Sequence, residues 1–147
     1  MTRRKHIVDT MYRLASVKEQ QATLAMSQAE RERQAAADEA NALEAAADAG
    51  EAELTGAPTL GSVERELLWA HRTWVRQERV ATEERLAVTA QQVADAQARL
   101  FQRRKDTRVR EKVRDHVVSH ELSERELKTQ KELDDIASTR WGRGHGQ

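Results

Sequence analysis

The stretch GEAELTGAPTLGS, residues 50–62, divides the chain into two long segments. It holds three of the six glycines and the only proline, and the other three glycines lie at the C-terminus, from Gly142 onward. Because glycine and proline interrupt helices, this distribution predicts two helices, one on each side of the stretch. Gly56 is a candidate left-handed cap for the first helix, which tolerates Gly50 near its end, and Ser62 is a favourable N-cap for the second.

Composition supports long helices rather than a globular core, since 34% of the 147 residues are charged and only 3% are aromatic. We therefore predict an all-α protein, with two long helices in an antiparallel coiled-coil hairpin and a longer, overhanging second helix. The expected segments are a first helix within 1–54, a hairpin loop at 55–62, a second helix at 63–138 and a disordered tail at 139–147.

Several classes of protein do not fit the sequence. No window approaches the roughly 18 apolar residues of a membrane span, and the N-terminus has no apolar signal region, so we expect a cytoplasmic protein without direct membrane insertion. Zero cysteines exclude thiol catalysis and zinc fingers of the cysteine type. We find no nucleophile with a base and no phosphate-binding loop, and therefore expect no enzyme activity and no cofactor.

Small and apolar residues follow alternating steps of three and four along both segments, which is the pattern of a coiled-coil seam. In the first helix the predicted seam positions are Tyr12, Ala15, Glu19, Ala22, Met26, Ala29, Arg33, Ala36, Ala40, Leu43 and Ala47. In the second helix they are Val63, Leu67, Ala70, Trp74, Gln77, Ala81, Glu84 and Val88.

A loop centred between positions 58 and 59 would make facing residue numbers sum to about 117 in an antiparallel pair. This register pairs Arg33 with Glu84, so that two polar interruptions of the seam would form an ion pair. A slip of about seven residues would preserve the same stripe, because the pattern repeats by heptads. The apolar and small pairs expected from this register are Leu43 with Trp74, Ala36 with Ala81, and Ala29 with Val88.

The second helix is too long for the first, and this register leaves residues from about 117 to 137 without an intramolecular partner. The overhanging section nevertheless keeps an apolar stripe of Val118, Leu122, Leu133 and Ile136. An isolated helix with an apolar stripe is typical of a protein-binding segment. Self-association of the overhang and folding back onto the hairpin are alternatives.

Charges are unevenly placed although the formal net charge is zero. Positions 103–114 hold seven Lys/Arg against two Asp/Glu, whereas positions 30–53 hold eight Asp/Glu against two Lys/Arg. In the expected register the basic run lies beside Arg3, Arg4 and Lys5. The terminal end of the hairpin should therefore be cationic and suited to an acidic partner.

Two stretches carry a resemblance to a known family. They are IVDTMYRLASVKEQQATLAMSQAE, residues 7–30, and QKELDDIA, residues 130–137. Together with the chain length and the expected hairpin, they resemble the flagellar export protein FliJ and its relatives of type III secretion systems, the YscO group. The resemblance extends over essentially the whole chain, although the middle of the second helix does not align clearly.

The resemblance implies a soluble stalk protein, peripheral to the inner-membrane export apparatus, that inserts its terminal end into a hexameric export ATPase. It implies promotion of ring assembly and ATP hydrolysis, a link to the membrane protein of the export gate, and contact with export chaperones. The expected contacts with the ring are Val118, Leu122, Gln130, Lys131, Leu133, Asp134, Asp135 and Ile136. The expected contacts with the gate are Trp69, His71 and Val75, with Trp69 favoured because Trp74 belongs to the predicted seam.

Other interpretations remain open. His116 and His120, four residues apart, could bind a metal ion, but a third ligand is missing, so we expect no metal site. The basic run could contact DNA, but its interleaved acids and the lack of a following leucine heptad argue against nucleic acid as a partner. A cytoplasmic coiled-coil adaptor or export chaperone without ATPase coupling is the main alternative function.

Overall fold

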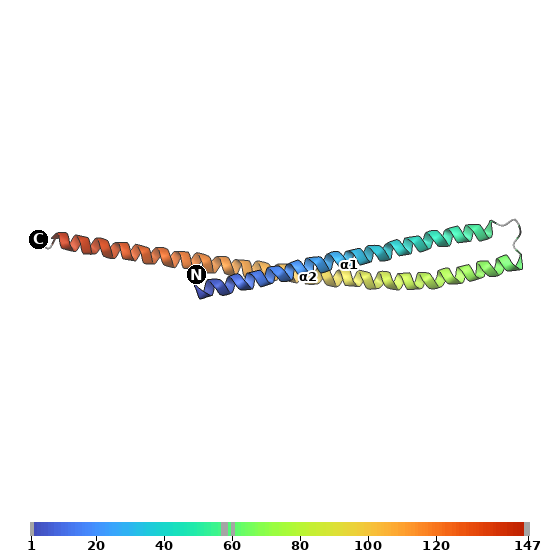
Figure 1. Ribbon diagram of the computed structural model, residues 1–147, viewed down its shortest axis with the longest axis horizontal. Helices are drawn as coiled ribbons and strands as arrows, with labels where there is room; N and C mark the ends of the chain where they lie inside the picture. Colours follow the sequence, from blue (N-terminus) through green and yellow to red (C-terminus); the bar gives the residue numbers. More distant parts are fainter. Residues whose placement is uncertain (1, 57–58, 60, 146–147) are drawn as a thin grey trace. The chain divides into compact units, whose positions relative to one another are not determined.

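The computed structural model describes residues 2–56, 59 and 61–145, and of the last of these only the backbone. The described residues form two helices and no strand, α1 (Arg3–Thr55) and α2 (Ser62–His145). The two helices run antiparallel, side by side, so the predicted all-α helical hairpin is confirmed (Figure 1). The chain separates into a terminal unit, residues 1–19 with 102–147, and a loop unit, residues 20–101.

The helix ends differ in part from those expected. α1 ends one residue later than expected, and Gly56 is no left-handed cap, because no described glycine has a positive φ. Its N–H instead donates to the Ala52 carbonyl at 3.0 Å, as it would inside a helix. The expected loop centre at 58 and 59 lies largely outside the described residues.

α2 continues beyond the expected end at residue 138, so the predicted disordered tail is helical as far as His145. Residues 146 and 147 lie outside the described residues. Gly142 and Gly144 have open space around them, and a glycine costs a helix only about 1 kcal/mol relative to alanine. Because propagation of an existing helix is far easier than nucleation, two glycines do not end it.

The seam of α1 lies where its pattern predicts. Ala29, Ala36, Leu43 and Ala47 are buried in the loop unit, and the other predicted seam positions are half-buried except Arg33, which is exposed. Alanine at these positions lets the helices approach closely, but each alanine buries little apolar area, at about 25 cal/mol per Å². The two helices therefore lie close together, but their contact buries little apolar area.

The seam of α2 differs from the predicted one by one position. The buried residues are Leu68, Val75, Thr82, Val93, Ala96, Leu100 and Thr107. The predicted seam residues Trp74, Glu84 and Val88 are exposed, and Ala81 is half-buried, so this part of the prediction is wrong. α2 carries two neighbouring stripes with the same heptad step, and periodicity alone cannot tell which one faces α1.

The register differs by about five residues from the one expected. In the loop unit, Ala29 packs with Val93, and in the terminal unit the Thr107 hydroxyl donates to the Ala15 carbonyl at 3.3 Å; both pairs of residue numbers sum to 122. The expected ion pair between Arg33 and Glu84 is absent, because Arg33 bonds within its own helix to Glu30 at 3.1 Å. The expected register assumed that the hairpin is centred between residues 58 and 59, whereas the observed pairs are centred near residue 61.

Cross-helix ion pairs accompany this register in the loop unit. The Arg79 guanidinium donates to both carboxylate oxygens of Glu44, at 2.6 and 2.7 Å. Equivalent pairs join Glu39 with Arg85 and Glu51 with Arg72. α1 supplies the acid and α2 the arginine each time. Each exposed pair stabilises the contact only weakly, but the sequence of pairs disfavours a seven-residue slip.

Candidate protein-binding surfaces

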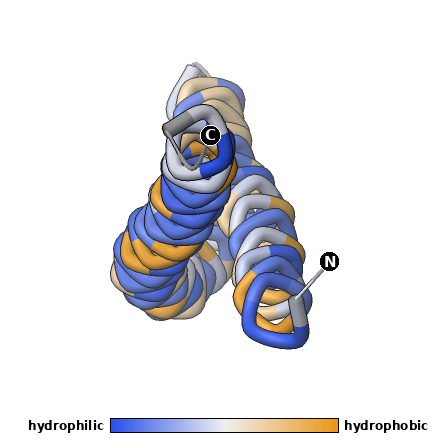
Figure 2. Tube along the Cα trace, turned by 90° about the vertical axis from the view of Figure 1, so that its left-hand side faces the viewer, coloured by the Kyte–Doolittle hydropathy of each residue, from blue (hydrophilic) through white to orange (hydrophobic). Residues whose placement is uncertain are grey.

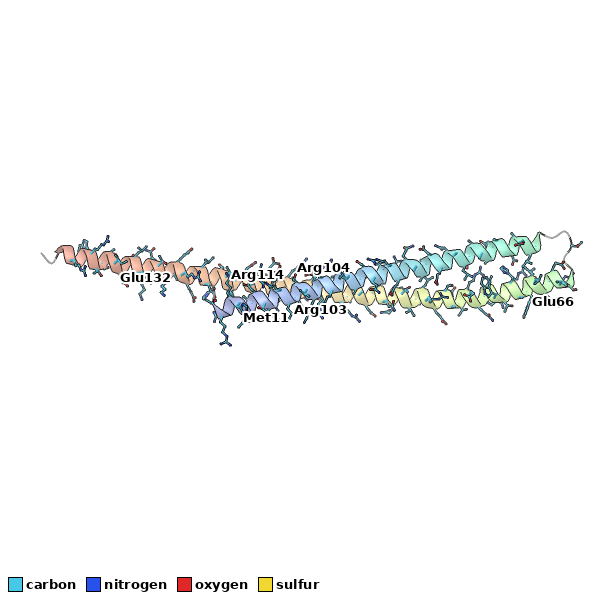
Figure 3. The ribbon with its side chains drawn as sticks, viewed as in Figure 1. Met11, Glu66, Arg103, Arg104, Arg114 and Glu132 are labelled. Carbon is cyan, nitrogen blue, oxygen red and sulfur yellow. The ribbon has the colours of Figure 1, made fainter. Side chains whose placement is uncertain are left out.

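The overhang of α2 exposes large apolar side chains in the terminal unit. Thr2 donates a hydrogen bond to Glu121, and every described side chain from Leu122 to Gly144 is exposed. Because the register is shifted, the overhang begins near residue 122 and not near 117 as expected. Figure 3 shows Glu132 on this section of α2, with no part of α1 beside it, whereas Met11 and Arg103 lie where the two helices run together.

The predicted stripe lies on this overhang. Leu122, Leu133 and Ile136 are 53%, 57% and 52% exposed, whereas Val118 lies beside the end of α1 and is half-buried. Three large aliphatic side chains on one face of this helix are exposed to water. Burying each one fully against a partner would gain about 1.5–3 kcal/mol of free energy. The overhang can therefore bind an apolar surface of another protein.

The polar residues expected at the ring contact lie on the same section and are exposed, namely Gln130, Lys131, Asp134 and Asp135. The Gln130 amide donates to the Asp134 carboxylate at 3.3 Å, one helical turn away. The Thr139 hydroxyl donates to the Asp135 carbonyl at 2.8 Å. The pair of Gln130 and Asp134 supports the helix by tenths of a kcal/mol and so helps to keep the overhang helical.

A groove between the helices in the terminal unit was not predicted. It is lined by Met11, Leu14, Ala15, Lys18, Arg103, Asp106, Val109 and Arg110. Its apolar side chains Leu14 and Val109 are more than half exposed, and Ile7 and Val113 are exposed nearby. The spacing of Ile7, Met11 and Leu14 is a second helical stripe beside the seam, a signal that was present in the sequence.

Basic side chains surround this groove and several have partners within the unit. The Arg114 guanidinium lies 4.0 Å from the centre of the Tyr12 ring, a cation–π contact, and Arg104 lies 3.9 Å from Glu19. In the observed register the N-terminal arginines and lysine lie level with residues 117–119, not beside the whole basic run as expected. The surface nevertheless remains cationic.

Two of the three expected gate contacts are not available as surface residues. Val75 is buried at 5% exposure in the seam, and the His71 ring is half-buried, with Nε2 at 3.2 Å from the Ala47 carbonyl oxygen. His71 lies directly over Gly50, where a Cβ atom would collide with the ring. Trp69 alone is fully accessible, at 71% exposure.

The stripe that was predicted as the α2 seam forms a second exposed apolar surface, in the loop unit. Its large members are Val63, Leu67, Trp74 and Val88, and all four are exposed. Figure 2 shows hydrophobic positions interspersed among hydrophilic ones along both helices. This lateral stripe has the step of a coiled coil and can pack against a helix of another protein.

Two glutamates of the loop unit have perturbed acidity. The hydrogen bond from Arg79 lowers the pKa of Glu44 below its usual 4.5, and the hydrogen bond from Arg72 does the same to the pKa of Glu51. In turn, the carboxylates raise the pKa values of Arg79 and Arg72. These pairs are charged at neutral pH and belong to the hairpin contact rather than to a reactive site.

The described residues hold no group of three or more His, Cys, Asp or Glu side chains that could bind a metal ion. The His116 and His120 rings lie 6.4 Å apart, and His120 Nδ1 is 3.5 Å from Glu124. Neither described helix has a segment apolar and long enough to cross a membrane. The candidate binding features among the described residues include the overhang, the groove, Trp69 and the lateral stripe.

Comparison with known proteins gives no family assignment, because no family model matches the chain and no curated protein or solved structure matches it significantly.

Proposed function

We propose that this chain is a non-enzymatic stalk or coupling component of a flagellar or related type III protein export apparatus. Its overhang enters the hexameric ring of the export ATPase, promotes ring assembly and ATP hydrolysis, and links the ring to the export gate. The observation that carries the proposal is the exposed overhang of α2, whose apolar stripe and QKELDDIA segment lie together on an unpaired helix. The resemblance to the FliJ group supplies the partner.

In this mechanism the overhang acts by binding and provides no reacting group. Leu122, Leu133 and Ile136 contact the inner surface of the ring, while Lys131 and Asp135 fix the rotation of the helix by polar contacts. A ligand that binds the assembled ring and not its separate subunits stabilises the ring by mass action. The cationic groove and its neighbours favour approach to an acidic ring entrance.

Contact with the export gate is assigned to Trp69 and not to Val75, because only the former side chain is accessible. Tryptophan is enriched among residues that dominate interface energies. Position in the peripheral apparatus on the cytoplasmic side, and contact with export chaperones, remain parts of the proposal that rest on the resemblance.

The adaptor hypothesis is the second candidate, and the lateral stripe of the loop unit favours it. A partner helix packed on Leu67 and Trp74 would need no ATPase. The two functions differ in which surface matters: the stalk needs the overhang, whereas an adaptor of this kind needs the lateral stripe.

The test compares substitutions on two faces of the overhang. Leu133→Asp and Ile136→Asp should abolish stimulation of the purified export ATPase, whereas Leu127→Asp, an exposed position off the stripe, should preserve it. Circular dichroism should show equal helicity for all three variants. Normal stimulation by both stripe variants would remove the overhang from the mechanism.

A further inference from the structure

We propose that a second copy of this chain covers the overhang, by laying its own groove along it, in a reciprocal antiparallel dimer. In this dimer the overhang of each copy lies in the groove between α1 and α2 of the other copy's terminal unit. The dimer and the inserted stalk use the same stripe and therefore exclude each other, and the dimer is formed by the chain alone, without the ATPase. The proposal rests on length, on the position of the apolar residues and on charge.

The paired section of the terminal unit can accommodate most of the overhang. The overhang extends from Leu122 to His145, about 36 Å at about 1.5 Å per residue. The section of α2 that is paired with α1 in the terminal unit, residues 102–121, is about 30 Å long. A two-fold axis beside the first residues of α1 therefore lays each overhang along the paired section of the other copy. This arrangement leaves little of α2 unpaired.

The apolar residues meet under the same symmetry. An axis between Glu121 and Leu122 places residues level when their numbers sum to about 243. Leu133 of one copy then lies level with Arg110 of the other, and Ile136 lies level with Thr107. These levels are the centre of the groove, where Leu14 and Val109 expose their side chains. The position of the axis follows from where α1 begins, and it was not chosen to bring these apolar residues together.

The groove is basic, and one segment of the overhang, residues 131–135, is acidic. The groove is lined by Lys18, Arg103 and Arg110 against one acid, Asp106. On the overhang, positions 131–135 hold three acids against one lysine. Asp134 and Asp135 of one copy come level with positions 109 and 108 of the other, beside Arg110 and Arg108. This complementarity favours the acidic segment 131–135 of a second copy over a neutral or basic segment.

The experiment is sedimentation of the full chain over a range of concentrations, with variants of each surface. We expect a dimer that Leu133→Asp and Leu14→Asp each convert to a monomer, and that Leu127→Asp leaves intact. The critical sample mixes the two disruptive variants. Reciprocal exchange keeps one of the two contacts in the mixed pair, because one copy has an intact overhang and the other an intact groove, so dimer should partly return.

A charge exchange gives a second test in which folding is monitored by helicity. Asp134→Arg with Asp135→Arg should abolish the dimer, Arg108→Glu with Arg110→Glu should abolish it too, and the chain with all four changes should dimerise again. A chain that is monomeric at every concentration overturns the proposal. So does a dimer that survives Leu14→Asp, because the overhangs would then pair with each other.

Discussion

At the scale of single residues, Gly50 shows how a position in a helix can depend on its neighbour across the hairpin. The sequence suggested only that a glycine is tolerated near the end of α1. The structure gives a cause, because the His71 ring occupies the space of a Cβ atom and reaches the Ala47 carbonyl. No pattern within α1 could reveal this, since the ring comes from α2 through the unpredicted register.

Gly50→Ala should therefore fail to give the usual stabilisation. Alanine gains about 1 kcal/mol over glycine inside a helix, but here His71 must move and lose its hydrogen bond, worth about 0.5–1.5 kcal/mol. In a His71→Ala background the same substitution should stabilise by about 1 kcal/mol. Urea denaturation followed by circular dichroism measures both. Equal gains in the two backgrounds would show that the ring does not restrict this position.

The perturbed glutamates predict a dependence of stability on pH. Because the folded pKa values of Glu44 and Glu51 lie below the ordinary 4.5, their ion pairs stabilise the fold above that pH. This contribution is lost as the pH falls through the lower, folded values. We expect Glu44→Gln and Glu51→Gln to reduce the drop in melting temperature between about pH 6 and pH 3, and added salt to have a similar effect. An unchanged pH profile in the double variant would contradict these assignments.

At the scale of the helices, the α1 seam was predictable and the α2 seam was not. The small residues of α1 form one clear stripe, whereas α2 has two stripes one position apart, Leu68 with Val75 and Leu67 with Trp74. The choice between them depends on the register, which depends on a loop that heptad periodicity does not describe. The existence of the overhang was predictable from the lengths of the two helices. Its start was expected near residue 117 and lies near residue 122, because the predicted register was wrong by about five residues.

A double-mutant cycle tests the observed register. Exchanging the charges of Glu44 and Arg79 should restore the stability that each single reversal, Glu44→Arg or Arg79→Glu, removes, with a small but measurable coupling. Arg33→Glu and Glu84→Arg provide the matched control. Their effects on the free energy of unfolding should add without coupling, because these residues do not meet. Coupling in the control pair alone would restore the register expected from sequence.

At the scale of the whole molecule, the candidate site could be predicted in its general form but not in its details. The QKELDDIA segment and its stripe were identified from sequence, and the structure leaves Leu122, Leu133 and Ile136 exposed. The groove was missed because Leu14 and Val109 belong to different helices and come together only in the observed register. The lateral stripe was recognised, but as an internal seam.

If Trp69 and the lateral stripe bind a gate or adaptor partner, variants of these residues should lose that binding and keep ATPase stimulation. We expect Trp69→Ala with Trp74→Ala to weaken binding to the purified gate domain at least tenfold and to leave ATPase stimulation unchanged. Titration calorimetry measures the first and a coupled hydrolysis assay the second. Undiminished gate binding by the variant would exclude both tryptophans from that contact.

The most direct measurement is the rate of ATP hydrolysis by the organism's purified export ATPase, alone, with the full chain, and with a chain ending at Glu121. This truncation removes the overhang and keeps the paired section of the terminal unit. We expect stimulation by the full chain and none by the truncated one, with the truncated hairpin still helical. Equal stimulation by both chains, or stimulation by neither, would contradict a stalk that acts through its overhang.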